Sequence, residues 1–297
     1  MSSLGQKERI EAIIASGERA ADKIRKFLEG GDPILLYGGF GLPGAVSLKH
    51  FLESLGWGKS FPLMTASEFL YGVLPYYEGT LRAIYYMGSV RERNLAASLA
   101  SGMRVMGGDL LLVTPYFDDP IVKKMVGEEE MARIEGSTEP LISEVIASSL
   151  AGLYHATSSG KRTDMRIDRL REDMSSLRGL LAGFLEESCP VLREFLDGKS
   201  AIDIIHTPYL TAPASILSYK LIENGIDARI IESDVSLAIA ESLHNAVLIY
   251  TSVEENSIKE LSFRLAMAKK PGKQIRLNID PLSAQVYASF LSLCISQ

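Results

Sequence analysis

The stretch PILLYGGFGLPG, residues 33–44, decides the fold of this chain. Its first part, PILLY, is a short apolar run of the kind that forms a strand buried on both faces of a parallel sheet. Pro43 suits the first turn of a helix, because the backbone N–H that proline lacks has no partner there. The stretch therefore predicts a strand, a glycine turn and a helix, the first step of a parallel α/β unit.

The glycines of the turn also match the pattern G-x-G-x-x-G, as Gly39, Gly41 and Gly44, and Glu68 ends the next apolar run. A strand, this pattern, a helix and a later acidic residue together outline a dinucleotide-binding site. An NAD(P)-dependent oxidoreductase is therefore one hypothesis. The other hypotheses for the loop are a cradle for a different phosphate group and a tight turn that binds nothing.

Length and composition limit the class of protein. The chain has 297 residues, 46% of them hydrophobic and 23% charged, which suffices for two domains with full cores. A net charge of -6 argues against a nucleic-acid partner, which requires a basic face. The apolar runs are shorter than the roughly 20 residues of a membrane span. The N-terminal MSSLGQKERIEA is too polar for a signal peptide.

The chain has two cysteines, Cys189 and Cys294, which lie far apart in the sequence. Two isolated cysteines are typical of a reducing compartment, and the Cys/His spacing of a metal site is missing. The acidic residues at 118–119 and 128–130 are interpreted as solvated turns rather than metal ligands. The sequence therefore predicts a cytoplasmic protein without a metal.

Strands and helices alternate along the chain after a first helix predicted over 6–29. Residues 166–197 predict a helical linker that is interrupted at Cys189-Pro190, because proline disrupts the preceding turn. The fold class predicted is α/β, with two tandem units that are each a parallel sheet flanked by helices. The predicted domains are 1–160 and 161–297. Strands are predicted at 33–39, 61–67, 81–88, 109–115, 201–209, 227–233, 245–252 and 273–280, and further helices over 43–55, 91–106, 140–157, 212–224 and 255–270 and from 234 and 281.

The two halves of the chain also resemble each other. PGAVSLKHFLE (43–53) aligns with PASILSYKLIE (213–223) without a gap, and AIYYMGSVRERN (83–94) aligns with AVLIYTSVEENS (246–257). Both matches occur in the same order and on the same predicted elements, which favours an internal duplication. The second copy lacks the glycines of the first, so the glycine turn does not define the unit.

Several motifs together resemble the sugar isomerase (SIS) domain family in its tandem form. They are ASEF (66–69) with Tyr71, STEP (137–140), YKLIE (219–223) and LHNA (243–246). Similar segments occur in the isomerase half of glucosamine-6-phosphate synthase and, for the first glycine loop, in phosphoglucose/phosphomannose isomerase. The resemblance covers the chain from about residue 30 onward.

The resemblance implies a function and a set of catalytic residues. SIS domains bind phosphosugars at the carboxyl ends of the parallel strands, and isomerase members move a proton between C1 and C2 through an enediol, without a cofactor. By position, Glu223 is implied as the base, Lys220 as its charged neighbour one turn earlier, and His244 as the group that opens the sugar ring. Sites of this family often form between subunits, which implies a homodimer.

The resemblance also implies residues that bind the sugar phosphate. Ordinary structural roles are the alternative for each residue: a tight turn, helix caps at Ser89, Ser137 and His244, and an exposed helix end at Glu223. Glu68 is expected at the edge of the site or at a domain or subunit contact. The implied binding residues are Gly39, Gly41, Gly44, Ser89, Arg91, Ser137 and Thr138.

The loops depart from the family pattern at the positions that usually carry hydroxyl groups. Phe40, Gly41 and Pro43 stand in the first loop, and Tyr86, Gly88 and Arg91 occupy those positions in the second. A guanidinium group or backbone N–H groups could hold a phosphate instead. A phosphosugar isomerase is therefore the first hypothesis, and a non-catalytic or regulatory sugar-phosphate-binding protein is the alternative. The sugar and the retention of catalysis stay open at this point.

Overall fold

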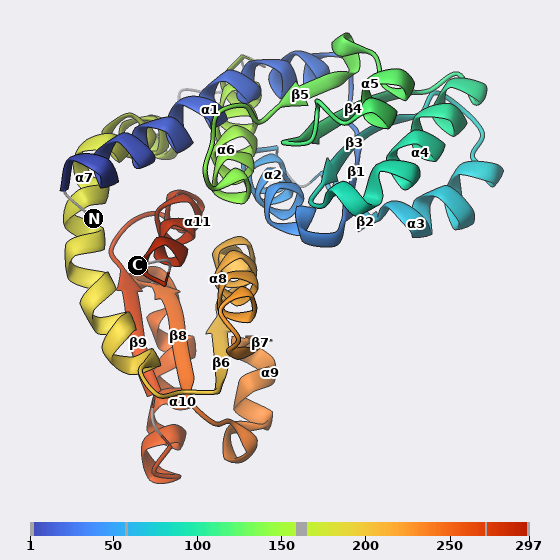
Figure 1. Ribbon diagram of the computed structural model, residues 1–297. Coiled ribbons are helices and arrows are strands. Elements are labelled where there is room, and N and C mark those ends of the chain that lie inside the picture. The colour runs from blue at the N-terminus through green and yellow to red at the C-terminus, as the bar shows by residue number, and fades with distance from the viewer. Residues whose placement is uncertain (1–2, 57–58, 159–164, 271, 296–297) are drawn as a thin grey trace. The chain divides into compact units, whose positions relative to one another are not determined.

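The computed structural model describes residues 3–56, 59–158, 165–270 and 272–295. The chain divides into two compact units, Ser2–Ile167 and Asp168–Gln297 (Figure 1). Each unit contains a parallel sheet with helices on both faces, which confirms the predicted α/β fold class. The predicted boundary between residues 160 and 161 lies outside the described residues.

The sheet of the first unit has five parallel strands in the order β2-β1-β3-β4-β5. Its central strands are apolar on both faces, as expected for strands covered by helices on both sides. The strands are β1 (Ile34–Gly38), β2 (Leu63–Thr65), β3 (Arg82–Met87), β4 (Asp109–Thr114) and β5 (Met131–Arg133).

Helices cover the two faces of this sheet and form two apolar cores. One core lies under α1 (Ser3–Glu29), α2 (Leu42–Leu55) and α6 (Pro140–Ser158), and it includes Leu35, Ile84 and Tyr86. The other lies under α3 (Ala66–Glu68), α4 (Arg93–Val105) and α5 (Pro120–Met125). In Figure 1, α1 and α6 run alongside each other.

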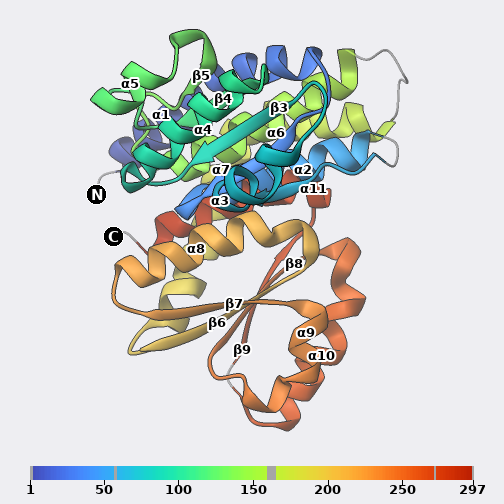
Figure 2. The same cartoon turned by 90° about the vertical axis from the view of Figure 1, so that its right-hand side faces the viewer.

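The second unit repeats this plan with four strands in the order β7-β6-β8-β9. Figure 2 shows α8 on one side of this sheet and α9 and α10 on the other. The strands are β6 (Ala201–His206), β7 (Asp227–Glu232), β8 (Ala246–Thr251) and β9 (Gly272–Leu277), and the helices are α7 (Met165–Leu196), α8 (Thr211–Glu223), α9 (Ser233–Ala238), α10 (Glu255–Met267) and α11 (Pro281–Ser289).

The strand order of the second sheet equals that of β2-β1-β3-β4 in the first. The segments aligned by the repeat fall on α2 and α8 and on β3 and β8 with the turns that follow these strands. In each sheet the chain leaves the two central strands in opposite directions, so their carboxyl ends form a switch point. Ligands of open α/β sheets bind at such a point.

Three short elements of the first unit were not predicted, and one of them, α3, begins at Ala66 within the strand predicted at 61–67. Strand β5 has only three residues, and α5 begins at Pro120, where Asp119 caps the helix by accepting hydrogen bonds from the N–H groups of Ile121 and Val122. Segments this short lack a measurable periodicity, so a pattern of residues does not reveal them.

The predicted interruption of the linker at Pro190 is wrong. Helix α7 continues through this residue to Leu196. Pro190 is exposed, whereas Leu185, Cys189 and Leu192 on the opposite face are buried. The buried apolar residues before and after the proline pack against the second unit and hold the helix in place. Because Pro190 is exposed, water can bind the carbonyl group that the proline leaves without a donor.

The prediction of isolated cysteines is also wrong. Cys189 on α7 forms a disulfide with Cys294 at the end of the 3-10 turn η9 (Phe290–Cys294). The two residues are 105 positions apart, so only the fold brings them together. This pairing removes the cysteine argument for a reducing compartment, and the cytoplasmic location stays a prediction.

Across the described ranges, the model contains no helix that is both long enough and apolar enough to cross a membrane.

Loss of the disulfide is expected to destabilise the second unit by about 4 kcal/mol, because the bond closes a long loop and restricts the unfolded chain. The measurement is chemical denaturation of the parent with and without reductant, followed by circular dichroism. The Cys189→Ser/Cys294→Ser double variant is the control, and reductant is expected to leave it unchanged. Equal stability of the oxidised and reduced parent would contradict this account.

Candidate functional site

The loops after β1 and β3 meet at the switch point of the first sheet. The loop after β1 forms the 3-10 turn η1 (Gly39–Gly41), and Gly88 directly follows β3. The N–H of Gly88 donates to the carbonyl oxygen of Gly38 at 3.4 Å. The first loop therefore lies directly on the backbone of the second.

The glycines are required by this close approach. A Cβ atom at Gly41 would lie 2.2 Å from the carbonyl oxygen of Tyr86, and one at Gly88 would lie 2.1 Å from the nitrogen of Gly41. A Cβ at Gly44 would overlap the Tyr86 ring at 2.6 Å. Gly39 has φ of 45°, a conformation that favours glycine. The pattern G-x-G-x-x-G thus has a packing reason in this chain.

The carboxylate of Glu92 lies in the space that these glycines leave. Glu92 ends the 3-10 turn η4 (Val90–Glu92), and its carboxylate lies close enough to the backbone N–H groups of Gly88 and Ser89 for them to lower its pKa. The Tyr85 hydroxyl donates to Oε2 of Glu92 at 3.2 Å. A Cβ at Gly38 would lie 2.6 Å from Oε2, and one at Gly39 would lie 2.4 Å from Oε1. The two loops therefore hold an anion, and this anion belongs to the chain itself.

A second carboxyl group, that of Glu144 on α6, lies beneath the same loop. A Cβ atom added at Gly44 would lie 3.1 Å from the Cβ of Glu144. The side chain is fully buried, and neither oxygen has a hydrogen-bond partner within the described part of the chain. Burial, with repulsion from Glu92, raises the pKa of Glu144 well above its usual value. Burial therefore favours the protonated, uncharged form of Glu144.

Burial also raises the pKa of Glu92, whereas the hydrogen bonds from Tyr85 and the loop N–H groups act in the opposite direction. Behind the loop, the hydroxyl groups of Tyr86 and Ser148 are hydrogen-bonded at 2.6 Å, and burial raises the pKa of Tyr86. The crevice is thus lined by the partly buried Glu92 carboxylate and by groups whose uncharged forms burial favours.

Ser89 and Arg91 flank this carboxylate. The Ser89 hydroxyl accepts a hydrogen bond from the Arg91 N–H at 3.3 Å, which confirms the predicted cap at the start of η4. The Arg91 side chain is exposed, and its guanidinium forms no ion pair with another residue in the described part of the chain. It is a cation beside the crevice.

The remaining candidates of the first unit have local roles. Ser137 accepts a hydrogen bond from the Glu139 N–H at 3.1 Å ahead of α6, as the capping alternative predicts, and Thr138 is exposed. Glu68 accepts hydrogen bonds from the N–H and hydroxyl of Thr65, and the backbone donor in particular lowers the pKa of Glu68. A role of Glu68 at a domain or subunit contact stays a prediction.

The catalytic candidates lie in the second unit. Lys220 and Glu223 form an ion pair of 3.3 Å in the last turn of α8, and the Glu223 side chain is 61% exposed. Helix α8 starts at the carboxyl edge of its sheet, so its last turn lies toward the opposite edge of this sheet. The geometry confirms the pairing of the two side chains, and their catalytic role stays a prediction.

His244 lies at the amino edge of the same sheet, two residues before β8. Its backbone N–H donates to the buried carboxylate of Asp203 at 2.7 Å. Arg229 binds the same carboxylate through two nitrogens, at 2.7 and 2.9 Å. Within this unit, His244 is thus on the edge opposite the switch point, and its role in ring opening stays a prediction.

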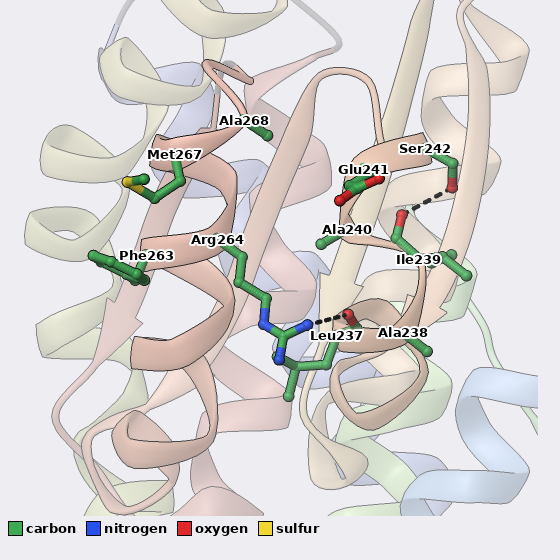
Figure 3. Close-up of a pocket in the computed structure, with 10 residues that line it drawn as sticks. All are labelled: Leu237, Ala238, Ile239, Ala240, Glu241, Ser242, Phe263, Arg264, Met267 and Ala268. Carbon is green, nitrogen blue, oxygen red and sulfur yellow. Dashed lines mark hydrogen bonds between the residues drawn. The ribbon is translucent and has the colours of Figure 1, made fainter.

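A cavity of about 630 Å³ also opens at the amino edge of this sheet (Figure 3). It lies between the 3-10 turn η7 (Ala240–Ser242) and the last turns of α10. Arg264 donates a hydrogen bond to the carbonyl oxygen of Leu237 at 3.5 Å, and the exposed apolar residues Phe263 and Met267 lie on the side of α10 away from Arg264 (Figure 3). The cavity contains none of the predicted site residues.

The described residues include no group of three or more His, Cys, Asp or Glu side chains that could hold a metal ion.

Neither glutamate of the crevice was singled out from the sequence. The signal for Glu92 is S-x-x-E at 89–92, a pattern in which the glutamate reaches back to the first N–H groups of a helix. The signal for Glu144 is a single acidic residue within the apolar segment LISEVIASSL, residues 141–150. Neither pattern reveals that the two side chains lie at the glycine loop.

Solved structures share the fold of the whole chain. The C-terminal domain of glucosamine-fructose-6-phosphate aminotransferase from Francisella tularensis superposes with a TM-score of 0.67 at 13% identity, over 97% of this chain and 95% of that one. Glucosamine-6-phosphate deaminase from Thermotoga maritima gives 0.65 at 12% identity, over 96% and 94%. Tagatose-6-phosphate ketose/aldose isomerase from Escherichia coli gives 0.63 at 13% identity, over 96% and 91%. The chain therefore has the tandem SIS fold predicted from its sequence.

Sequence comparisons add little to this result. No model of a protein family matches the chain. The chromosome partition protein Smc of Rhodopseudomonas palustris (strain ATCC BAA-98 / CGA009) is 27% identical over 169 residues, which are 53% of this chain and 15% of that protein. Because the match spans so small a part of Smc, it carries no argument about function.

Replacing Gly41 by alanine is expected to destabilise the first unit by about 2 kcal/mol, because the added Cβ meets a backbone oxygen that cannot rotate away. The φ of Gly41 is -75°, so the effect is one of space alone. Gly183→Ala is the control, since nothing lies within 4 Å of its Cβ position on exposed α7. That variant is expected to gain about 0.5–1 kcal/mol of stability. Chemical denaturation compares them, and a neutral Gly41→Ala contradicts the packing account.

The neutral state of Glu144 predicts a pH dependence of stability. Its pKa is raised above 4.5 in the folded state, so the folded chain keeps a proton that the unfolded chain releases. This contribution is complete below about pH 4.5 and declines as the pH rises. Glu144→Gln removes it, so the stability of the variant relative to the parent is expected to rise from pH 5 to 8, by at most about 1.4 kcal/mol per pH unit. Denaturation at several pH values measures this difference, and a constant difference contradicts it.

Proposed function

We propose that this chain binds a phosphorylated sugar at the loops after β1 and β3. The observation that carries the proposal is that a carboxylate of the chain, that of Glu92, already lies over Gly38 and Gly39 and accepts a hydrogen bond from Tyr85 between these loops. A phosphate group requires the same kind of donors, and a glycine-walled loop brings the backbone close to it.

Two further features support the proposal. Arg91 carries an exposed cation that forms no ion pair in the described ranges, next to the loop, and a guanidinium fork suits phosphate oxygens. Proteins with the same fold are named for enzymes of phosphorylated sugars, among them glucosamine-6-phosphate deaminase and tagatose-6-phosphate ketose/aldose isomerase. The switch point is also the usual ligand position in a parallel sheet.

Hexose 6-phosphates are expected to raise the melting temperature of the purified protein, because a ligand of the native state stabilises it. Arg91→Ala is expected to weaken this binding about tenfold through the loss of a charge-assisted contact. Arg171→Ala, which removes an exposed arginine from α7, is the control. NAD(H) and NADP(H) are expected to have no effect. Stabilisation by a nicotinamide cofactor and not by sugar phosphates would favour an oxidoreductase.

Aldose–ketose isomerisation through an enediol is the second candidate function. The ion pair of Lys220 and Glu223 favours it, because moving a proton between C1 and C2 requires a carboxylate base and the family pattern implies this pair. In this reading Glu223 is the base that moves a proton between C1 and C2 of the open sugar, Lys220 holds its charge, and His244 assists ring opening. A homodimer belongs to the same proposal, and sedimentation tests it.

Isomerisation is expected to place deuterium from solvent at C2 of a hexose 6-phosphate, which proton NMR detects. Glu223→Gln is expected to abolish this exchange while it leaves the binding of the sugar phosphate unchanged. Glu260→Gln is the matched control, since Glu260 forms a similar exposed ion pair with Arg264 on α10. If the parent binds a hexose 6-phosphate but exchanges no deuterium at C2, the non-catalytic sugar-phosphate-binding hypothesis is favoured instead.

A further inference from the structure

We propose that Glu92 is an internal competitor for the phosphate group, so that a ligand enters the loops of the first unit only by displacing its carboxylate. This inference rests on the proposed function, whose binding site it concerns. It makes Glu92 the residue that determines which ligands the site accepts.

The carboxylate occupies the space that an incoming anion needs. It fills the space over Gly38 and Gly39, where a Cβ would come within 2.6 and 2.4 Å of its oxygens. It also accepts a hydrogen bond from the hydroxyl of Tyr85 and lies near the N–H groups of Gly88 and Ser89, which lower its pKa. A phosphate and this carboxylate therefore cannot occupy the crevice at the same time.

Two other glutamates show what an ordinary capping carboxylate looks like in this chain. Glu68 caps Thr65 after β2, and Glu254 caps Thr251 after β8, at 2.6 Å from its hydroxyl. Neither of these two carboxylates lies against a glycine loop from a neighbouring strand. Neither one is among the nearest atoms that a Cβ added at a described glycine would contact. Glu92 differs because the loop after β1 covers it from the other side.

The position of Glu92 favours exchange over permanent occupation. Burial disfavours the ionised side chain there, which its raised pKa reflects. A phosphate dianion can use the same donors and in addition the Ser89 hydroxyl and the Arg91 guanidinium, which the carboxylate does not contact. Burial raises the pKa of the nearby Glu144 and so favours its uncharged form, which does not repel an incoming anion.

The competition selects ligands by charge. A neutral sugar offers only hydroxyl groups and does not replace an ionised carboxylate on these donors, whereas a phosphorylated sugar does. The site of the parent protein is therefore closed to neutral sugars and binds sugar phosphates more weakly than its donors alone allow.

Calorimetric titration with inorganic phosphate and with glucose 6-phosphate tests the proposal on the full chain. Glu92→Ala frees the loop donors and is expected to bind both ligands at least tenfold more tightly than the parent. Glu254→Ala is the control, because it removes a capping carboxylate that no glycine loop covers. Its affinity for both ligands is expected to stay within twofold of that of the parent. An affinity of Glu92→Ala equal to or below that of the parent overturns the proposal.

An NMR measurement on the parent does not depend on the folding of a variant. Saturation with phosphate is expected to shift the carboxyl carbon resonance of Glu92 and the amide resonances of Gly88 and Ser89 together. Saturable binding with an unchanged Glu92 carboxyl resonance overturns the proposal and leaves the proposed function standing. If neither the parent nor Glu92→Ala binds a sugar phosphate, the proposed function fails and the inference fails with it.

Discussion

The contact between the loop after β1 and the end of β3 is the constraint on which the first unit depends. The backbone of Gly41 lies against the carbonyl group of Tyr86, and Gly88 lies against the first loop in turn. Backbones approach this closely only where no side chain intervenes, which is why both Gly41 and Gly88 exclude a Cβ. Helix α2 follows at once from the same turn and covers one face of the sheet. The glycines therefore serve the packing of strand, loop and helix before they serve any ligand.

The same contact creates the chemistry of the crevice. Bringing the two loops together places the carboxylate of Glu92 over Gly38 and Gly39, where the Tyr85 hydroxyl donates to it. A further acid beneath the loop, Glu144, has no hydrogen-bond partner among the described residues, and burial raises its pKa well above the usual value. The same packing thus raises the pKa of both glutamates, and hydrogen bonding opposes this effect only at Glu92.

The second unit uses the same strand order with other stabilising interactions. At its amino edge, the buried Asp203 binds Arg229 and the backbone of His244, which joins β6, β7 and the entry to β8. A disulfide ties α7 to the last turn of the unit. The carboxyl end of β8 carries a capping box instead of a glycine crevice. The duplicated plan is therefore kept in the topology, while the donors and charges at equivalent strand ends differ.

The sequence by itself determined the alternation of strands and helices, the tandem arrangement and the tight turn at 38–44, because periodicity, proline and glycine act over a few residues. It also contained S-x-x-E at 89–92, a local pattern. Only the tertiary structure decided that Glu92 lies over Gly38, that Glu144 is buried beside Gly44, that α7 passes Pro190, and that Cys189 meets Cys294. Most of these facts join residues far apart in the chain, and the helix at Pro190 depends on the buried face of α7. The order of strands and the packing of helices set such contacts, and a pattern of neighbouring residues carries no record of them.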